Sequence, residues 1–285
     1  MTDRWLEGRV VAITGAAGGL GRAVATLFSQ HGAKLVLNDL GCSVDGVGHS
    51  EDPVNSLAES LRAEGAEVIT HHGDVAIASE ASALMQSAVT HFGGLDGLVC
   101  LAGIQRERTV LKMEEQDFDA VYRTVVKGSM LCAQAAGRVF AQQRRGGHIV
   151  LCTSIAGMFG NYGQVNGSAA SAAVYGLTRT LAIELKKQSV RVNAIAPIAR
   201  TRMTEGQPMF AAMPDETYGA HFVAPAVLFL CSSLCGELSG EVLSIAGTKL
   251  STYRVVESEG ALLDDPRTAW DPREIARRFD ALSRL

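Results

Sequence analysis

Short apolar runs rich in β-branched residues alternate along the chain with amphipathic segments. Leu20–His31 predicts a helix that ends at Gly32, and Asp52-Pro53 opens a second helix that ends at Gly65. An N-cap residue followed by proline marks a helix start, and glycine marks a helix end. The apolar runs predict strands at Val10–Thr14, Lys34–Leu37, Glu67–His71, Leu98–Leu101, His148–Cys152, Arg191–Ala194 and Val242–Ile245.

Strands that alternate with helical patterns are typical of a parallel sheet covered by helices. We therefore predict an α/β fold, a single-domain doubly wound parallel sheet of the Rossmann type with helices on both faces. No repeat and no linker divides residues 1–252. Residues 253–285 are more charged and carry a short helical pattern at Pro272–Leu285. We interpret them as an arm that packs on the domain or on a neighbouring subunit.

Composition narrows the class of protein. Hydrophobic residues make up 47% and charged residues 20% of the 285 residues, which excludes intrinsic disorder. The net charge of −4 excludes a broad basic surface for nucleic acid. The 30 glycines follow no collagen-like period, so they are expected in turns and at close backbone approaches.

No stretch of about 20 mostly apolar residues predicts a membrane span, and the first residues do not resemble a secretion signal. We therefore expect a cytoplasmic protein with reduced cysteines. No Cys-x-x-Cys or histidine cluster predicts a metal site. Ser283-Arg284-Leu285 resembles the peroxisomal Ser-Lys-Leu address, which makes the peroxisome the alternative in a eukaryote.

A glycine-rich turn, Thr14 to Gly21, follows the first strand directly and opens the first helix. Glycines let the backbone approach a pyrophosphate, and the helix N-terminus supplies N–H groups and a positive dipole. The second strand ends at Asn38-Asp39, eighteen residues past Gly21. An acid there binds both ribose hydroxyls of NAD and repels the 2′-phosphate of NADP. The pattern predicts an NAD site; the alternative is a strand–helix turn without a ligand.

From residue 8 to about residue 250, the chain resembles the short-chain dehydrogenase/reductases, whose Thr-Gly-x-x-x-Gly-x-Gly motif it carries. Within that family it resembles the (3R)-hydroxyacyl-CoA dehydrogenase domains of peroxisomal multifunctional enzymes type 2. The shared stretches are Asn38–Gly41, Arg106-x-Arg108, Lys112-Met113, Gly160–Gln164, Ile195–Ala199, Thr201–Thr204 and Tyr218–Cys231.

The resemblance implies NAD as cofactor, and Asp74-Val75 as the pair that contacts the adenine. It implies a small-molecule substrate, an acyl-CoA thioester or a steroid. It also implies a homotetramer or homodimer built on the helices within residues 114–143 and 166–188. The cofactor-binding positions that it assigns are Gly15, Gly19, Leu20, Gly21, Asp39, Asp74, Val75, Ala102, Gly103, Pro197 and Ile198.

Catalysis in this family needs a tyrosine whose pKa is lowered by a lysine four residues later, a serine that orients the carbonyl, and a helical asparagine that holds a water relay. Ser154 matches the serine. The tyrosine, lysine and asparagine positions are Gly167, Ser171 and Val125. The resemblance therefore implies an intact cofactor site beside a degenerate proton relay.

No other residue reproduces the spacing of tyrosine and lysine. We interpret Tyr162 as a pocket or packing residue, Tyr175 as a helix–helix contact, Lys127 as structural or exposed, and His148 as a satisfied strand-end histidine. Cys152 has no visible base partner.

Three functions remain open at this point. The first is an oxidoreductase of the hydroxyacyl-CoA or hydroxysteroid type that is slowed by roughly 10²–10⁴ without acid–base catalysis. The second is a non-catalytic NAD-binding subunit that forms a heteromer with an active relative. The third is a non-redox enzyme that reuses the pocket.

Overall fold

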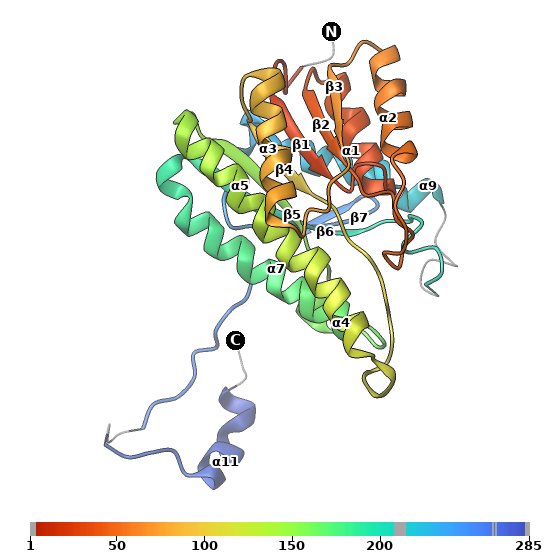
Figure 1. Cartoon of the computed structure of the whole chain (residues 1–285). Coiled ribbons are helices and arrows are strands. Elements are labelled where there is room, and N and C mark those ends of the chain that lie inside the picture. Colours follow the sequence, from red (N-terminus) through yellow and green to blue (C-terminus); the bar gives the residue numbers. More distant parts are fainter. Residues whose placement is uncertain (1–3, 208–214, 264, 266, 283–285) are drawn as a thin grey trace. The chain divides into compact units, whose positions relative to one another are not determined.

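The computed structural model describes residues 4–207, 215–263, 265 and 267–282. The chain divides into two compact units, Met1–Thr252 and Tyr253–Leu285. The first unit is built on an eight-stranded sheet with the order β3-β2-β1-β4-β5-β6-β7-β8 (Figure 1). Its strands are β1 (Val10–Thr14), β2 (Lys34–Asn38), β3 (Val68–His71), β4 (Gly97–Cys100), β5 (Gly147–Cys152), β6 (Val190–Ile198), β7 (Val242–Ala246) and β8 (Lys249–Thr252).

All seven expected strands are present and pair in parallel, and only β8 runs antiparallel to its neighbour. The main helices are α1 (Gly19–Gln30), α2 (Asp52–Ala63), α3 (Ala78–Phe92), α4 (Glu115–Tyr122), α5 (Gly128–Gln143), α7 (Val165–Glu184) and α10 (Ala224–Cys231). Shorter helices are α6 (Ala156–Phe159) and α9 (Asp215–Tyr218). The fold prediction is confirmed: this is a Rossmann-like α/β unit with a mostly parallel sheet.

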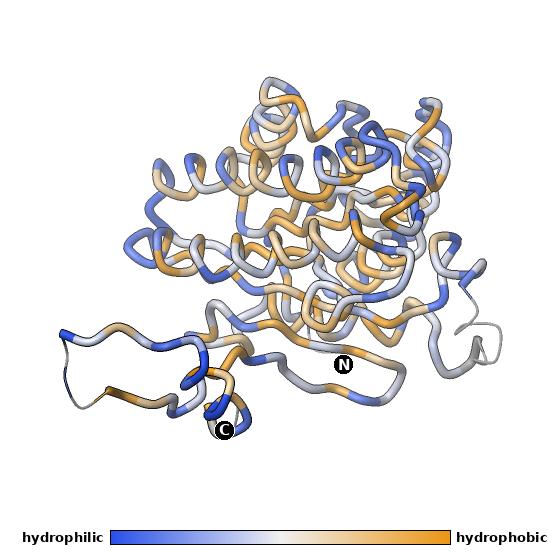
Figure 2. The backbone as a smooth tube through the Cα atoms, turned by 90° about the horizontal axis from the view of Figure 1, so that it is seen from below, coloured by the Kyte–Doolittle hydropathy of each residue, from blue (hydrophilic) through white to orange (hydrophobic). Residues whose placement is uncertain are grey.

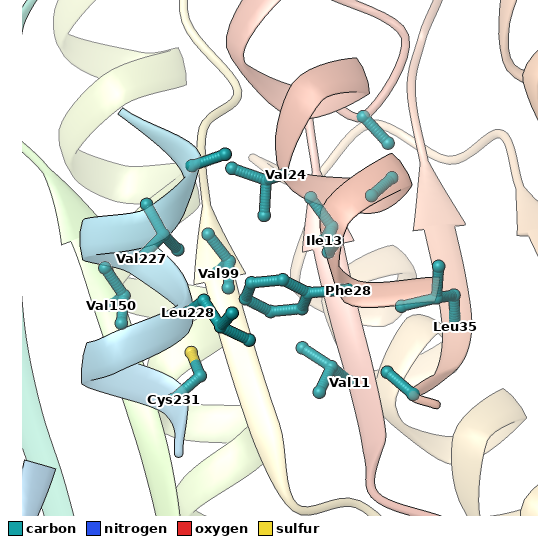
Figure 3. Packing of buried hydrophobic residues seen from close by; sticks show 14 of the residues in the cluster. Val11, Ile13, Val24, Phe28, Leu35, Val99, Val150, Val227, Leu228 and Cys231 are labelled. Carbon is teal, nitrogen blue, oxygen red and sulfur yellow. The ribbon is translucent and has the colours of Figure 1, made fainter. Parts of the chain in front are cut away.

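One face of the sheet is covered by α1, α2 and α10, which share one buried hydrophobic cluster. Figure 3 shows Phe28 of α1 at its centre, beside Val11 and Val99 of the sheet and Leu228 of α10. The Phe28 side chain has no solvent exposure. Full burial of such a ring contributes about 1.5–3 kcal/mol by transfer from water alone, so this cluster is a principal source of stability.

The opposite face is covered by α3, α5 and α7, which contact one another or the strands (Figure 1). Leu98 and Ile149 are buried and alternate with Val99 and Val150 of the first cluster, so they belong to this side. Figure 2 shows hydrophobic colours along much of the backbone inside the first unit, while hydrophilic colours lie at many of its outer turns. Burial on both faces explains why the strands read as continuous apolar runs.

β6 extends to Ile198, four residues beyond the expected end. Its pairing with β5 stops at the partners Cys152 and Ile195, so the later part of β6 pairs with β7 alone. Pro197, which has no N–H to donate, is accommodated there because that side of the strand has no partner.

The segment after residue 114 is one helical rod interrupted by a π turn, Arg123–Lys127, between α4 and α5. A π turn carries one extra residue per turn and is frequent at functional sites. Val125, the position that the resemblance assigns to asparagine, lies within this turn.

The second unit contains α11 (Pro272–Leu282), where the short helical pattern predicts it. Arg278 stacks over Trp270 at 5.7 Å and pairs with Glu274. Residues 283–285, which carry the candidate peroxisomal address, lie outside the described residues. Packing of this arm on the first unit or on a subunit stays a prediction. Within the described part of the chain, no helix is long and apolar enough to cross a membrane.

Candidate functional site

A cavity of about 600 Å³ opens at the carboxyl ends of the parallel strands. The strand order turns at β1, with β2 on one side and β4 on the other, and such a switch point forms a crevice in doubly wound folds. Every site residue predicted from the sequence lines this cavity.

The glycine turn has the geometry that the sequence predicts. Gly15 has φ +65°, and a Cβ there would lie 2.7 Å from the backbone of Leu101 and Ala102. A Cβ on Gly21 would lie 2.2 Å from the Gly15 carbonyl oxygen. These two glycines are therefore required for close packing of the turn against β4 and α1. Gly18 is the N-cap of α1 and has no side chain to satisfy the first N–H groups, which stay available for a phosphate.

Asp39 lies directly after β2 and fixes the turn. One carboxylate oxygen accepts the Ala17 N–H at 2.9 Å, and the other accepts the Gly41 N–H at 2.8 Å. A carboxylate has about four acceptor positions, so each oxygen retains capacity for a ribose hydroxyl. The carboxylate therefore has the orientation and the charge to hold a ribose.

Asp74 and Val75 line the cavity after β3. The Asp74 carboxylate accepts the Ala76 N–H at 2.9 Å and pairs with Arg123 of the π turn at 2.7 Å. Arg123 thus links the end of β3 to the helical rod. Sequence reasoning did not identify this ion pair, because the two residues are far apart in the chain.

His71 supports the same end of the cavity. Its Nδ1 accepts the Gly73 N–H at 3.2 Å and faces the Asn38 amide nitrogen at 3.1 Å. Burial lowers the pKa of His71 despite the attraction of Glu80. Protonation of Nδ1 would replace an acceptor by a donor in front of two N–H groups, so the neutral ring is the form that fits.

The part of the cavity that Ala102, Gly103, Pro197 and Ile198 line is formed by backbone and small side chains. The Thr14 hydroxyl accepts the N–H groups of Leu101 and Ala102, both at 3.2 Å, which ties the end of β1 to the segment after β4. Val125 faces Gly103 across the cavity, since a Cβ on Gly103 would lie 3.8 Å from a Val125 methyl. Pro197 and Ile198, at the end of β6, also line the cavity.

Ser154 follows β5, and its Oγ accepts the Ala156 N–H at 3.2 Å. The hydroxyl proton makes no hydrogen bond to the residues that the structure describes, so it remains available for a ligand carbonyl. Gly167 and Ser171 lie one turn apart on α7, and both line the cavity. A Cβ at Gly167 would meet no atom within 4 Å, so open space lies where the resemblance places a tyrosine.

The described lining of the cavity contains no tyrosine, no lysine and no histidine. Tyr162 is 90% exposed and lies outside the lining, so its interpretation as a pocket or packing residue is wrong; Lys127 is exposed, as expected. His148 lines a separate cavity at the opposite end of β5, and its buried Nδ1 has no hydrogen-bond partner among the described residues, so the interpretation as a satisfied histidine is wrong for that atom. Removal from water raises the pKa of the Cys152 thiol to about 12, so it stays protonated and weakly nucleophilic near neutral pH.

Sequence reasoning also missed a polar cluster around Glu107. Its carboxylate accepts hydrogen bonds from Gln105, Gln164 and Gln207, and all four residues line the cavity. A signal was present, because Glu107 is the residue between Arg106 and Arg108 in one of the shared stretches. Within the described residues, no group of three or more histidine, cysteine or acidic side chains could hold a metal ion.

Comparisons with known proteins agree with this architecture. The family model "short chain dehydrogenase" matches residues 9–209. A crystal structure of a short chain dehydrogenase from Mycobacterium avium has a TM-score of 0.84 and 34% identity, covering 98% of this chain and 95% of that one. The chain therefore belongs to the short-chain dehydrogenase family, whose members use NAD or NADP.

Two relatives have more specific names. The "Peroxisomal multifunctional enzyme type 2" of Drosophila melanogaster is 38% identical over 271 residues, which cover 92% of this chain and 43% of that protein. The "Hydroxyacyl-CoA dehydrogenase ChsB1" of Mycobacterium tuberculosis is 33% identical over 283 residues, covering 95% of this chain and 87% of that protein. The chain thus spans less than half the length of the Drosophila enzyme.

Proposed function

We propose that this chain binds NAD(H) in the cavity and is of the 3-hydroxyacyl-CoA or hydroxysteroid dehydrogenase type, with a degenerate proton relay and weak or absent redox activity. One observation carries the proposal. The cavity has a glycine turn that can approach a pyrophosphate and, at Asp39, a carboxylate that can bind a ribose. Its described lining offers no phenol, amine or imidazole to carry a proton.

The part of the cavity around the glycine turn and Asp39, here called the cofactor half, supports binding of NAD in preference to NADP. The Asp39 carboxylate is held by two backbone N–H groups, so it cannot turn away from a ligand without losing them. A 2′-phosphate would lie against that negative charge. When bound, the nicotinamide supplies hydride transfer; the chain holds the dinucleotide and orients the ligand.

The part of the cavity around Ser154, Gly167 and Ser171, here called the substrate half, is the reason to expect weak turnover. Ser154 can donate to a carbonyl oxygen, which orients a ketone but cannot protonate it on reduction. Oxidation of a carbinol releases a proton that the family removes through tyrosine and lysine, and Gly167 and Ser171 offer neither group. Val125 cannot hold a relay water through its side chain.

The same observation supports a second candidate, a non-catalytic NAD-binding subunit. Such a subunit would form a heteromer with an active relative through α5 and α7, the helices on which we also expect a homodimer or homotetramer. Ile183 of α7 is 76% exposed, as an apolar contact residue would be in an isolated chain.

Two measurements test the proposal. Calorimetric titration with NADH and NADPH should show tighter binding of NADH; equal or tighter NADPH binding would contradict the role of Asp39 and direct attention to Arg202 beside Cys42. Oxidation of 3-hydroxyacyl-CoA thioesters and of hydroxysteroids should be slow or undetectable. Turnover at rates typical of dehydrogenases would contradict the degenerate relay. Copurification with an active relative would favour the subunit function.

A further inference from the structure

One carboxylate in the substrate half of the cavity is held by three amides. The Oε1 atom of Glu107 accepts hydrogen bonds from the side-chain nitrogens of Gln105 and Gln164, and from that of Gln207 at 3.3 Å. Gln164 is itself oriented, because its amide oxygen accepts from Asn161 at 2.8 Å. The donors therefore fix the carboxylate in one position.

Three segments of the chain meet at this point. Gln105 and Glu107 follow β4, Gln164 is the N-cap of α7, and Gln207 lies beyond β6. A β-bridge between Arg108 and Gln164 holds the first two segments side by side. The carboxylate is thus positioned by the fold and not by its own loop alone.

The other carboxylate oxygen, Oε2, accepts no hydrogen bond from any residue that the structure describes, and no cation pairs with Glu107 there. The flanking arginines are engaged elsewhere. Arg106 donates to the Asp45 carbonyl at 2.7 Å and pairs with Asp117, and Arg108 donates to the backbone carbonyl of Glu107 at 2.7 Å. A half-buried carboxylate normally has a charged partner or water, so this one is available to a ligand.

We infer that Glu107 determines specificity: its free oxygen accepts a hydrogen bond from a hydroxyl or ammonium group that the substrate carries in addition to its reacting carbinol or carbonyl. This inference rests on the proposed function only in that the ligand occupies the same cavity. The carboxylate attracts a hydrogen-bond donor, above all a cationic one, and repels an anionic substituent at the same place. No proton transfer is assigned to Glu107.

The experiment uses trans-4-substituted cyclohexanols as probes, with an amino, hydroxyl, methyl or carboxylate group at position 4. Each probe is titrated by ligand-observed NMR against the full chain, with and without NADH. We expect the amino and hydroxyl probes to bind about 10- to 100-fold more tightly than the methyl probe, and the carboxylate probe to bind least, because a hydrogen bond to a charged group is stronger than an apolar contact at the same place.

Glu107→Gln supplies the sharpest comparison. Glutamine keeps an oxygen for the three amide donors but places an NH₂ group where Oε2 was, so the amino probe should lose its advantage and the carboxylate probe should gain. Glu114→Gln is the matched control, because Glu114 is exposed, makes no capping hydrogen bond and does not line the cavity.

The inference is overturned if the wild-type chain binds none of the probes or binds all four equally. It is also overturned if folded Glu107→Gln retains the wild-type order. Melting temperatures establish folding, and if Glu107→Gln does not fold, the order of the four probes on the wild-type chain decides. Absence of NADH binding contradicts the proposed function instead, and the titrations without NADH show it separately.

Discussion

Gly167→Tyr combined with Ser171→Lys should produce NAD-dependent oxidation of a 3-hydroxyacyl-CoA where the native chain has little or none. Both positions line the cavity, one turn apart on the same face of α7. A side chain at position 167 enters open space, because a Cβ there meets no atom within 4 Å. Position 171 is tighter, since a Cβ on Gly157 would lie only 2.7 Å from the Ser171 Cβ. The lysine is therefore the substitution that places more strain on the fold.

The expected gain follows from the missing proton transfer. General acid–base catalysis contributes roughly 10²–10⁴ in rate, which corresponds to about 2.7–5.4 kcal/mol of barrier. Gly167→Tyr alone should gain much less, because a phenol with a pKa of about 10 is ionised to only about 0.1% at pH 7 without a neighbouring cation. Adding Val125→Asn should raise the rate of the double variant further, because an amide can hold a relay water where a methyl cannot.

The assay follows NADH formation from (3R)-3-hydroxybutyryl-CoA, after melting temperature and NADH titration have established that each variant folds and binds cofactor. A matched control is Gly176→Tyr with Thr180→Lys, which installs the same spacing on α7 at exposed positions that do not line the cavity. If the double variant at 167 and 171 folds, binds NADH and still equals this control, the missing relay is not the defect. Fast turnover by the native chain would also refute the reasoning, because the chain would then not lack a group for proton transfer.

Four further outcomes are expected. Asp39→Ala should weaken NAD binding by about 1–3 kcal/mol in calorimetry, and an unchanged affinity would remove the carboxylate from the ribose. Phe28→Ala should lower the free energy of unfolding in urea by about 3–5 kcal/mol, whereas Leu111→Ala, at a side chain that is 96% exposed, should change it by no more than about 0.5 kcal/mol. The pKa of His71 is lowered in the folded state, so as pH falls the unfolded chain binds the proton before the folded chain does. The free energy of unfolding should therefore decline as pH falls below about 6.5. In urea titrations, His71→Gln should reduce that decline, and an unchanged pH dependence would contradict the role of His71. Light scattering should show an assembly larger than a monomer at micromolar concentration if α5 and α7 form the proposed contacts between subunits, and a monomer would contradict those contacts.

The glycine turn and the position of Asp39 beside it could be predicted from the sequence because their determinants are local. The glycine turn joins β1 to α1 without a gap, and Asp39 immediately follows the last residue of β2. The parallel pairing of Thr14 with Asn38 then brings the two segments together. One strand, one turn and one helix that follow each other directly in the chain thus determine nearly all of the geometry of the turn.

The antiparallel strand β8 was not predicted because its four residues are mostly exposed and show no apolar run. A local signal exists, since Gly247-Thr248 connects the paired residues Ala246 and Lys249, and Gly247 has φ +57°. A two-residue loop that begins with glycine at positive φ is a common hairpin connection.

The Glu107 cluster could not be predicted in the same way, because it is a property of three distant segments. Gln105, Gln164 and Gln207 are each ordinary polar residues in loops or at a helix end, and only the fold places their amides on one oxygen. The π turn at Val125 is equally invisible, since the hydrophobic periodicity of residues 114–143 does not distinguish one long helix from two helices joined by an extra residue.

Under the proposed function, three roles of the cavity depend on three separate parts of the chain, so they can be lost independently. Dinucleotide binding would depend on β1–α1 and on the end of β2, the proton transfer expected of the family on α7, and selection of the ligand on the carboxylate at Glu107. An arrangement that retains the first and the third without the second would still bind cofactor and a donor-bearing ligand together, but would not interconvert them. A non-catalytic subunit that signals whether NADH is bound needs such a complex of chain, cofactor and ligand, formed without turnover. If NADH tightens binding of the amino probe while the native chain leaves hydroxyacyl thioesters unchanged, both results fit a chain that binds cofactor and ligand together without turnover.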